Sequence, residues 1–326
     1  MKILVTGGAG FIGSHIAEAL IRDGHSVTVL DNLYCGKKEF VPAEAEFVEG
    51  DIRNPYIKQI FASHHFDAVY HEAAQTQVPL SLESPGFDAD ENILGLIHIL
   101  TCACQTGVRK LIFSSSAAIY GSNARLPLSE KEIPAPDSFY GLSKWTGEQY
   151  IRLFQKLHGL SYTILRYSNV YGPRQGASGE GGVIYKFAEN LIQNKGLTIF
   201  GDGTQTRDFI SVCDIAAANV AALTHGDNET INISSGCECS LNQLAQLMQS
   251  LTHAHAGIRY EDSRPGDIHR SCLSRAKARE LLTWQPRTGL TDGLQPLTGL
   301  VPVGQAAPLP IGIPYFIGIP IYFLSF

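Results

Sequence analysis

A tyrosine and a lysine lie four residues apart in the segment SFYGLSKWTGEQY, residues 138–150. In a helix, this spacing places Tyr140 and Lys144 on one face, about one turn apart. A free phenol has a pKa of about 10 and is protonated at neutral pH. A fixed positive charge beside it favours the phenolate, so the pair could act as a base on an alcohol. The pattern is short, and a surface tyrosine near a surface lysine would share it.

The N-terminal segment KILVTGGAGFIGSHIAEALIRDGHSVTVLDN predicts a strand, a glycine turn, a helix and a second strand. Its turn has the pattern G-x-G-x-x-G, which lets the backbone approach a pyrophosphate at the N-terminus of the helix. Asp31 ends the second strand, where a carboxylate can bind both hydroxyls of an adenosine ribose. Because the same charge would repel a 2′-phosphate, the segment predicts NAD rather than NADP.

Alternating strands and helices follow this segment. Apolar strands are expected at 66–74, 108–116 and 160–170, with helices at about 90–106 and 143–158. This alternation predicts an α/β fold with a doubly wound parallel sheet, whose ligands bind beyond the carboxyl ends of the strands. The polar residues expected at that edge are Asp31, Asp51, His71, Ser114 to Ser116 and Tyr167.

The composition of the 326 residues narrows the classes of protein. A formal net charge of −6 argues against nucleic acid or an anionic membrane as the main partner. The seven cysteines include no C-x-x-C pair, so we expect thiols in a reducing compartment and no metal site. The first residues, MKILVTGGAG, lack the long apolar run of a signal peptide. A cytoplasmic location is therefore expected.

Several motifs together resemble the extended short-chain dehydrogenase/reductase family, and within it the nucleotide-sugar 4-epimerases. The motifs are TGGAGFIG, GDIRN, HEAA, FSSSAAIYG, YGLSK, RYSNVYGPRQ, GDGTQTRDFISVCDIA and RPGD, in this order between residues 6 and 267. The resemblance extends to about residue 293. It implies a Rossmann-type NAD-binding domain at 1–170 and about 208–235. A smaller, interleaved C-terminal substrate domain would comprise about 171–207 and 236–293.

The resemblance also implies roles for individual residues. Tyr140 would be the acid/base, Lys144 would hold the nicotinamide ribose, and Ser116 would share a hydrogen bond with the sugar hydroxyl. The implied NAD-binding residues are Gly7, Gly10, Phe11, Ile12, Gly13, Asp31, Asn32, Asp51, Ile52, Ala73, Ala74, Asn92, Ser114, Tyr140, Lys144 and Tyr167. The implied substrate-binding residues are Ser116, Asn169, Val183, Phe200, Arg207, Arg264, Asp267 and Ser271.

The residues after Ser116 bear on the reaction. Related dehydratases and decarboxylases carry acidic residues there, which move protons at other carbons, whereas this chain has Ala117 and Ala118. The resemblance therefore implies NAD-dependent epimerisation at carbon 4 of a UDP-hexose by a homodimer. Alternatives are a 4-epimerase of UDP-glucuronate or another nucleotide sugar, a dehydratase of the same family, and a non-catalytic NAD-binding scaffold. Ser271, where a bulky residue is common, predicts room for N-acetyl sugars. Thr76, where some members have lysine, predicts a less firmly held cofactor.

Residues 294–326 depart from the family pattern. The segment has no charged residue and contains six prolines, among them those at 308, 310, 314 and 320. Its length and apolarity suggest a membrane segment, but the prolines would remove helical hydrogen bonds that lipid cannot replace. An altered reading frame or a disordered apolar tail is the favoured interpretation. A membrane hook is the alternative.

Overall fold

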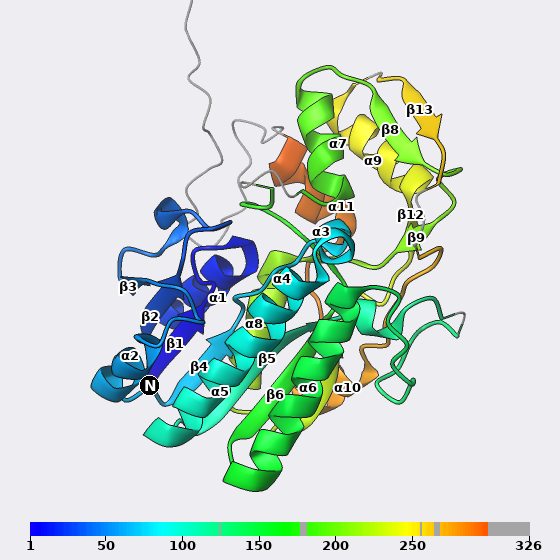
Figure 1. Cartoon of the computed structure of the whole chain (residues 1–326). Coiled ribbons are helices and arrows are strands. Elements are labelled where there is room, and N and C mark those ends of the chain that lie inside the picture. Colours follow the sequence, from blue (N-terminus) through cyan, green and yellow to red (C-terminus); the bar gives the residue numbers. More distant parts are fainter. Residues whose placement is uncertain (124, 177–180, 255, 264–267, 299–326) are drawn as a thin grey trace, which may run out of the picture.

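The computed structural model describes residues 1–123, 125–176, 181–254, 256–263 and 268–298. Within these residues, seven parallel strands form one sheet in the order β11-β6-β5-β4-β1-β2-β3 (Figure 1). Its strands are β1 (Lys2–Thr6), β2 (Ser26–Asp31), β3 (Glu46–Glu49), β4 (Ala68–His71), β5 (Lys110–Ser116), β6 (Ser161–Tyr167) and β11 (Glu229–Ile233). The order reverses between β1 and β4, which confirms the predicted doubly wound sheet.

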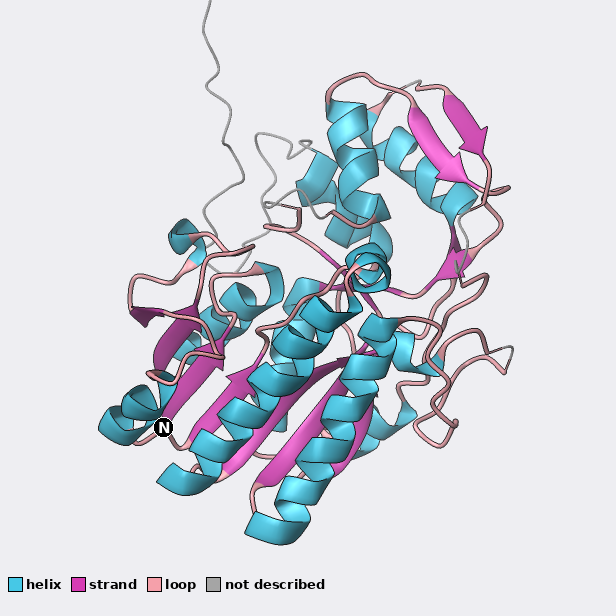
Figure 2. Cartoon of the chain, viewed as in Figure 1, coloured by secondary structure: helices cyan, strands magenta, loops and turns pink. Residues whose placement is uncertain are grey.

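Helices cover both faces of the sheet (Figure 2). One face carries α1 (Phe11–Arg22) and α8 (Val212–Ala222), which pack against each other. The other carries α2 (Ile57–His64), α5 (Gly95–Thr106) and α6 (Phe139–His158). Because both faces are covered, the middle of the central strand β1 is apolar, and its residues 3–5 are fully buried.

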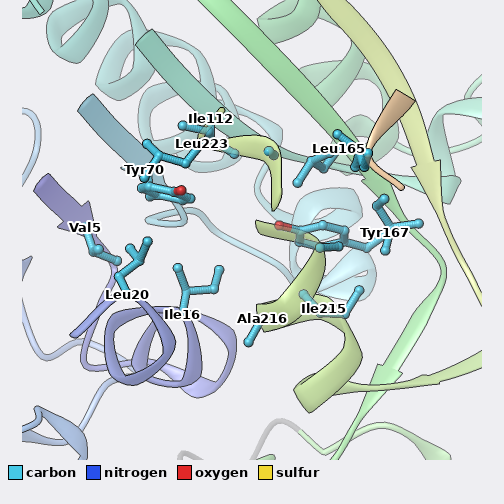
Figure 3. Packing of buried hydrophobic residues seen from close by; sticks show 14 of the residues in the cluster. Val5, Ile16, Leu20, Tyr70, Ile112, Leu165, Tyr167, Ile215, Ala216 and Leu223 are labelled. Atoms are coloured by element: carbon cyan, nitrogen blue, oxygen red, sulfur yellow. The ribbon is translucent and has the colours of Figure 1, made fainter. Parts of the chain in front are cut away.

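The core beneath α1 and α8 contains two tyrosines whose rings point toward each other (Figure 3). Tyr70 donates from its hydroxyl to the Asn219 carbonyl at 3.0 Å. Tyr167 accepts from the Asn219 side-chain amide at 2.8 Å. A buried phenol needs such partners. The two bonds therefore fix α8 against the ends of β4 and β6.

A smaller lobe lies beyond the carboxyl ends of the strands and has its own apolar core (Figure 1). Its main elements are α7 (Val183–Ile192), β8 (Leu197–Phe200), β9 (Thr206–Arg207), β12 (Cys239–Ser240), α9 (Leu241–Thr252), β13 (Ile258–Glu261) and α11 (Leu290–Leu294). A short parallel pair, β7 (Asn169–Tyr171) and β10 (Phe209–Ser211), connects it to the large sheet. Among the described residues, the other α-helices are α3 (Val78–Glu83), α4 (Pro85–Ala89) and α10 (Ala276–Leu281), and short 3₁₀ turns lie at Lys38–Phe40, Ala117–Tyr120 and Gln295–Thr298.

Three predicted elements differ from the structure in a boundary or in local form. The helix expected at 143 begins at Phe139, because the Ser138 hydroxyl accepts the Gly141 N–H at 3.1 Å and caps it. The strand expected at 160–170 is two strands, since the chain leaves the large sheet at Ser168 and pairs with β10. The helix expected from residue 90 opens with a π-helical turn over 90–94. Such turns are rare and often accompany functional sites.

None of the helices in the described ranges is both long and apolar enough to cross a membrane. The tail prediction concerns residues 294–326, of which 299–326 lie outside the described residues.

Candidate active site

The glycine turn between β1 and α1 forms the floor of a cavity of about 440 Å³. Gly7 has φ +68°, and a Cβ there would lie 2.6 Å from the Ala73 backbone nitrogen. A Cβ on Gly13 would lie 2.2 Å from the Gly7 carbonyl oxygen. Neither position can accommodate a side chain. The turn thus brings the N-terminus of α1 to the cavity, where backbone dipoles favour a phosphate.

One end of the cavity carries a carboxylate at the tip of β2. Asp31 accepts the backbone N–H groups of Ala9 at 3.0 Å and Leu33 at 2.8 Å. Burial raises its pKa, and these two bonds oppose the rise. Nearby, Asp51 accepts from Asn32 at 3.1 Å and from Arg53, which holds its pKa well below the usual range. The groups at this end are therefore hydrogen-bonded anions, as a ribose with two hydroxyls requires.

The other end carries the serine, tyrosine and lysine. Ser116 ends β5, and its hydroxyl accepts the Ala118 N–H at 3.1 Å and contacts the Tyr140 hydroxyl. Tyr140 and Lys144 project from the first two turns of α6, and the Lys144 ammonium lies 6.0 Å from the centre of the Tyr140 ring. Lys144 is 4% exposed and donates to the Ser114 carbonyl at 2.9 Å. The three side chains line one cavity.

The pKa of Tyr140 differs from the expectation. Burial raises it, the carboxylates of Asp88 and Glu72 act in the same direction, and the Ser116 hydrogen bond opposes them. We expected Lys144 to lower the pKa of Tyr140. The cost of removing the phenolate from water is larger than the stabilisation by a cation about one turn away, so the pKa rises instead. Burial also lowers the pKa of Lys144, against the pull of Glu72 and Asp88. The protein alone thus holds a protonated phenol beside an ammonium that loses its proton readily.

A buried ion pair sets the position of α6 relative to β5. Glu148 on α6 receives both Arg166 of β6, at 2.8 and 2.7 Å, and the Ser115 hydroxyl, at 2.7 Å. Arg166 also donates to the Tyr120 hydroxyl at 2.8 Å. Fully satisfied buried charges are rigid, and removing one partner costs several kcal/mol, about 3–5. Ser115 therefore has a structural partner, while its neighbours Ser114 and Ser116 face the reactive groups.

Most of the predicted site residues meet at this cavity. Those lining it are Gly7, Gly10, Phe11, Ile12, Gly13, Asp31, Asn32, Ile52, Ala73, Ala74, Ser114, Ser116, Tyr140, Lys144, Tyr167, Asn169 and Val183. Asp51 lies beside it, next to Ile52. Asn92 is buried behind the wall, where it bonds to the Gln75 N–H at 2.8 Å and the Ser143 hydroxyl at 3.1 Å.

Apart from Val183 at the start of α7, the predicted substrate residues that the structure describes in the small lobe do not line the cavity. Phe200 ends β8, Arg207 lies in β9, and Ser271 is buried two residues after His269, whose carbonyl accepts the Thr206 N–H at 2.9 Å. Arg264 and Asp267 lie outside the described residues. The small-lobe assignments therefore stay predictions.

Sequence reasoning missed three charged residues that line the cavity, namely Glu72, Glu91 and Arg174. Glu72 follows the strand-ending His71 within the HEAA motif, so a carboxylate at an active edge was the available signal. Arg174 lies in the RYSNVYGPRQ motif, has φ +70°, and donates to the Ser14 hydroxyl at 3.0 Å and to Glu18. Nothing in the sequence connects Arg174 with α1, because the two are more than 150 residues apart.

A doubly wound sheet, a glycine turn with its acidic residue, and a serine, tyrosine and lysine beyond the strand ends define a dinucleotide-binding enzyme that acts on alcohols. Comparison with known proteins leads to the same class of enzyme. The sequence pattern of the NAD dependent epimerase/dehydratase family matches residues 3–234, and the chain belongs to this family. It is an NAD-dependent isomerase of the epimerase type.

Similar proteins cover nearly the whole chain. The putative UDP-glucose 4-epimerase of Methanocaldococcus jannaschii is 44% identical over 90% of this chain and 96% of its own length. The crystal structure of Thermotoga maritima UDP-glucose 4-epimerase with UDP-glucose is 44% identical and superposes with a TM-score of 0.89 over 91% of this chain and 97% of that one. The UDP-N-acetylglucosamine 4-epimerase of Methanobrevibacter ruminantium M1, in complex with UDP-N-acetylmuramic acid, is 34% identical, with a TM-score of 0.87 over 91% and 97%.

Proposed function

We propose that this protein inverts carbon 4 of UDP-glucose and UDP-galactose through a 4-keto sugar. The observation that carries this proposal is that Ser116, Tyr140 and Lys144 share one cavity with the glycine turn and Asp31. The chain's similarity to UDP-glucose 4-epimerases over nine-tenths of its length supports the same reaction.

In the proposed reaction, Tyr140 first releases its own proton to solvent, and the phenolate then accepts the proton of the sugar 4-hydroxyl and returns it after the ketone has turned over. Ser116 holds that hydroxyl, while its own oxygen is fixed by the Ala118 N–H. Lys144 is placed to hold the nicotinamide ribose and to stabilise the phenolate when it forms. NAD, when bound, would supply the hydride acceptor and donor for carbon 4. Ala117 and Ala118 offer no acid for elimination, so chemistry stays at carbon 4.

The residues present fit an NAD molecule. The close approach of backbone at Gly7 and Gly13 suits a pyrophosphate, and the charge of Asp31 disfavours a 2′-phosphate. We infer that residues 1–170 with about 208–235 bind the cofactor. The segments at about 171–207 and 236–293 then bind the nucleotide sugar, with Arg207 and Arg264 on the diphosphate.

We infer a second substrate pair, UDP-N-acetylglucosamine and UDP-N-acetylgalactosamine. Ser271 occupies the position where the resemblance places a bulky residue in enzymes restricted to simple hexoses. A similar solved protein acts on UDP-N-acetylglucosamine, as its name states. A small side chain at this position leaves room for an acetamido group on carbon 2.

We infer a cytoplasmic homodimer joined through α5 and α6, which lie side by side on one face of the sheet (Figure 2). Leu142, Leu153 and Leu157 of α6 are 42%, 49% and 64% exposed. On α5, Leu96 and Leu100 have the helical spacing of an interface but pack inside the subunit. The exposed apolar face therefore belongs mainly to α6. Exposed faces of this kind cover each other in symmetric dimers.

The test is to assay purified protein with five UDP-sugars and to identify the bound cofactor by mass. The substrates are UDP-glucose, UDP-galactose, their two N-acetyl counterparts, and UDP-glucuronate. We expect 4-epimers from the first four and NAD in the protein. A protein that carries NAD but leaves UDP-galactose unchanged would contradict the proposed reaction. Light scattering across a dilution series tests the dimer, and a monomer throughout would contradict it.

A further inference from the structure

Glu72 is a carboxylate of the cavity wall that the proposed reaction does not use. It directly follows β4 and lines the same cavity as Tyr140 and Lys144. Its Oε1 atom is inaccessible to solvent and has no hydrogen-bond partner among the described residues. Burial raises the pKa of Glu72 to about 7, and the Ser114 hydroxyl, the Lys144 ammonium and the Tyr167 hydroxyl oppose this rise. A buried carboxylate oxygen left without a partner is costly unless a nearby charge stabilises it.

The nearby charge is the Lys144 ammonium. Lys144 donates to a neutral group, the Ser114 carbonyl, and packs 5.1 Å from the centre of the Phe113 ring. Glu72 is the largest favourable electrostatic influence on this buried ammonium, followed by Asp88. Asp88, however, already accepts from the side chains of Gln75, at 2.8 Å, and Asn92, at 3.2 Å. Glu72 is therefore the less saturated of the two carboxylates.

We propose that Glu72 is a positioning residue whose negative charge keeps the buried Lys144 ammonium charged at neutral pH and so sets the pH window of Tyr140. The proposal deepens the proposed NAD-dependent reaction and rests on it. Glu72 acts through Lys144 and Tyr140.

The charged and titratable groups around Glu72 determine in which direction the pH profile should move when its charge is removed. Glu72 interacts electrostatically with Lys144 and Tyr140 of α6, with Tyr167 of β6 and with Tyr70 of β4. Asp88 of α4 acts on the same Lys144 and Tyr140, and His71 directly precedes Glu72. His71 stays neutral, because burial lowers its pKa to about 3. The charge of Glu72 raises the pKa of both Lys144 and Tyr140. Removing that charge must lower both, so the two limbs of the pH profile should move together toward acid.

The experiment compares Glu72→Gln with the parent. The pH profile of kcat on UDP-galactose and the pH dependence of NAD affinity are both measured. We expect both limbs of the kcat profile, and the alkaline limb of NAD binding, to move about one unit or more toward acid. At a pH on the alkaline limb of the parent's profile, moving that limb by one pH unit lowers kcat about tenfold. Glu72→Asp, which keeps the charge, should retain the parent's profile.

Glu91→Gln is the matched control. Glu91 lines the same cavity but pairs with Arg53 at 2.9 Å, and it is not among the charges that act on Lys144. Its removal should leave the limbs in place. Limbs that do not move in Glu72→Gln, or an equal loss at every pH, would overturn the proposal. Should that variant fail to fold by circular dichroism, Glu72→Met removes the same charge and is judged by the same criterion.

Two outcomes separate this inference from the proposed function. If the parent converts no UDP-sugar, the proposed function fails, yet the alkaline limb of NAD binding still tests the Glu72 charge. If the parent is active and the limbs stay in place, the inference fails and the function stands.

Discussion

The two ends of the cavity treat buried charge differently. At the end that we assign to adenosine, Asp31 accepts two backbone N–H groups and Asp51 accepts from Arg53 and Asn32. At the end that we assign to the sugar and nicotinamide, Lys144 donates to a neutral carbonyl and Glu72 leaves one oxygen without a hydrogen bond among the described residues. The first end is electrostatically satisfied, and the second is not.

This difference matches the work of each end. A ribose and a pyrophosphate must be gripped in one arrangement, and saturated hydrogen bonds hold the gripping groups rigid. A proton must leave and return at the other end, and for that a group needs a protonation state that small changes can alter. Burial with incomplete pairing produces such states. The contrast predicts that substitutions at the reactive end change rates and pH profiles, while those at the adenosine end change affinity.

Tyr140→Phe should give the largest effect. It removes the phenol that exchanges the substrate proton but keeps the ring that packs beside Lys144. We expect kcat on UDP-galactose to fall by about 10²–10⁴-fold, the usual contribution of a general acid or base, with NAD still bound. Steady-state kinetics and the mass of the extracted cofactor are the measurements. Tyr150→Phe on the exposed side of the same helix is the control and should be silent.

A Tyr140→Phe enzyme with turnover within a few-fold of the parent would refute the acid/base assignment. If the variant loses both NAD and turnover, a substitution at the reactive end also changes cofactor affinity, and the proposed difference between the two ends of the cavity is wrong.

Lys144→Met should affect both rate and cofactor binding, because the ammonium serves both. The methionine fills nearly the same volume, so a lost charge is tested rather than a cavity. We expect kcat to fall by about 10²-fold and NAD to be released more readily on dilution. In the parent, burial lowers the Lys144 pKa, so activity should decline at a pH below that at which an exposed lysine titrates. This alkaline decline should be absent from the residual activity of the variant, and its persistence there would assign it to another group.

The sequence predicted the two ends unequally. Residues next to a strand's carboxyl end, such as Asp31, Ser116 and Tyr167, could be placed because parallel strands end at one edge. Tyr140 was identified from its spacing to Lys144, although the predicted helix began too late to contain it. The capping hydroxyl of Ser138 was the signal that would have corrected this boundary.

The partners of Glu72 and Arg174 could not be predicted. Glu72 faces residues of β5, β6 and α6, and Arg174 reaches α1 across more than 150 residues of sequence. Such contacts depend on packing, for which local patterns carry no signal. The same limit applies to Leu96 and Leu100, whose helical spacing fitted either a subunit interface or the core in which they lie.

Asp31→Asn should change affinity more than rate. The amide keeps the shape of the side chain but removes its charge and one acceptor of backbone N–H, at a cost of about 1 kcal/mol in stability. We expect the NAD affinity to fall by about tenfold and NADP binding to become measurable, with kcat at saturating NAD close to that of the parent. Calorimetry with the two cofactors measures this. If the parent already binds NADP as tightly as NAD, the reading of this carboxylate is wrong.

The smallest effect concerns a residue outside both ends. Ser271 is 8% exposed, and the neighbouring Cys272 carbonyl accepts the Leu128 N–H at 2.9 Å, so the segment is held in place. A tyrosine there fills the space proposed for the acetamido group. Pocket volume alone discriminates by about 10–200-fold, so the N-acetyl activity of Ser271→Tyr should fall by at least about tenfold while UDP-galactose is spared.

Ser271→Ala separates volume from hydrogen bonding, because it keeps the space and removes only the hydroxyl. If volume decides, this variant acts on both substrate pairs as the parent does. If the hydroxyl bonds the amide, its N-acetyl activity falls while its activity on simple hexoses does not.

Overpacking a buried position costs about 1–3 kcal/mol, so Ser271→Tyr must first be shown by thermal unfolding to be folded at the assay temperature. Equal losses on both pairs in a folded variant would show that Ser271 does not control sugar choice. If the parent protein is inactive on N-acetyl sugars, a small side chain at position 271 does not confer that activity. The enzyme would then act on simple hexoses alone.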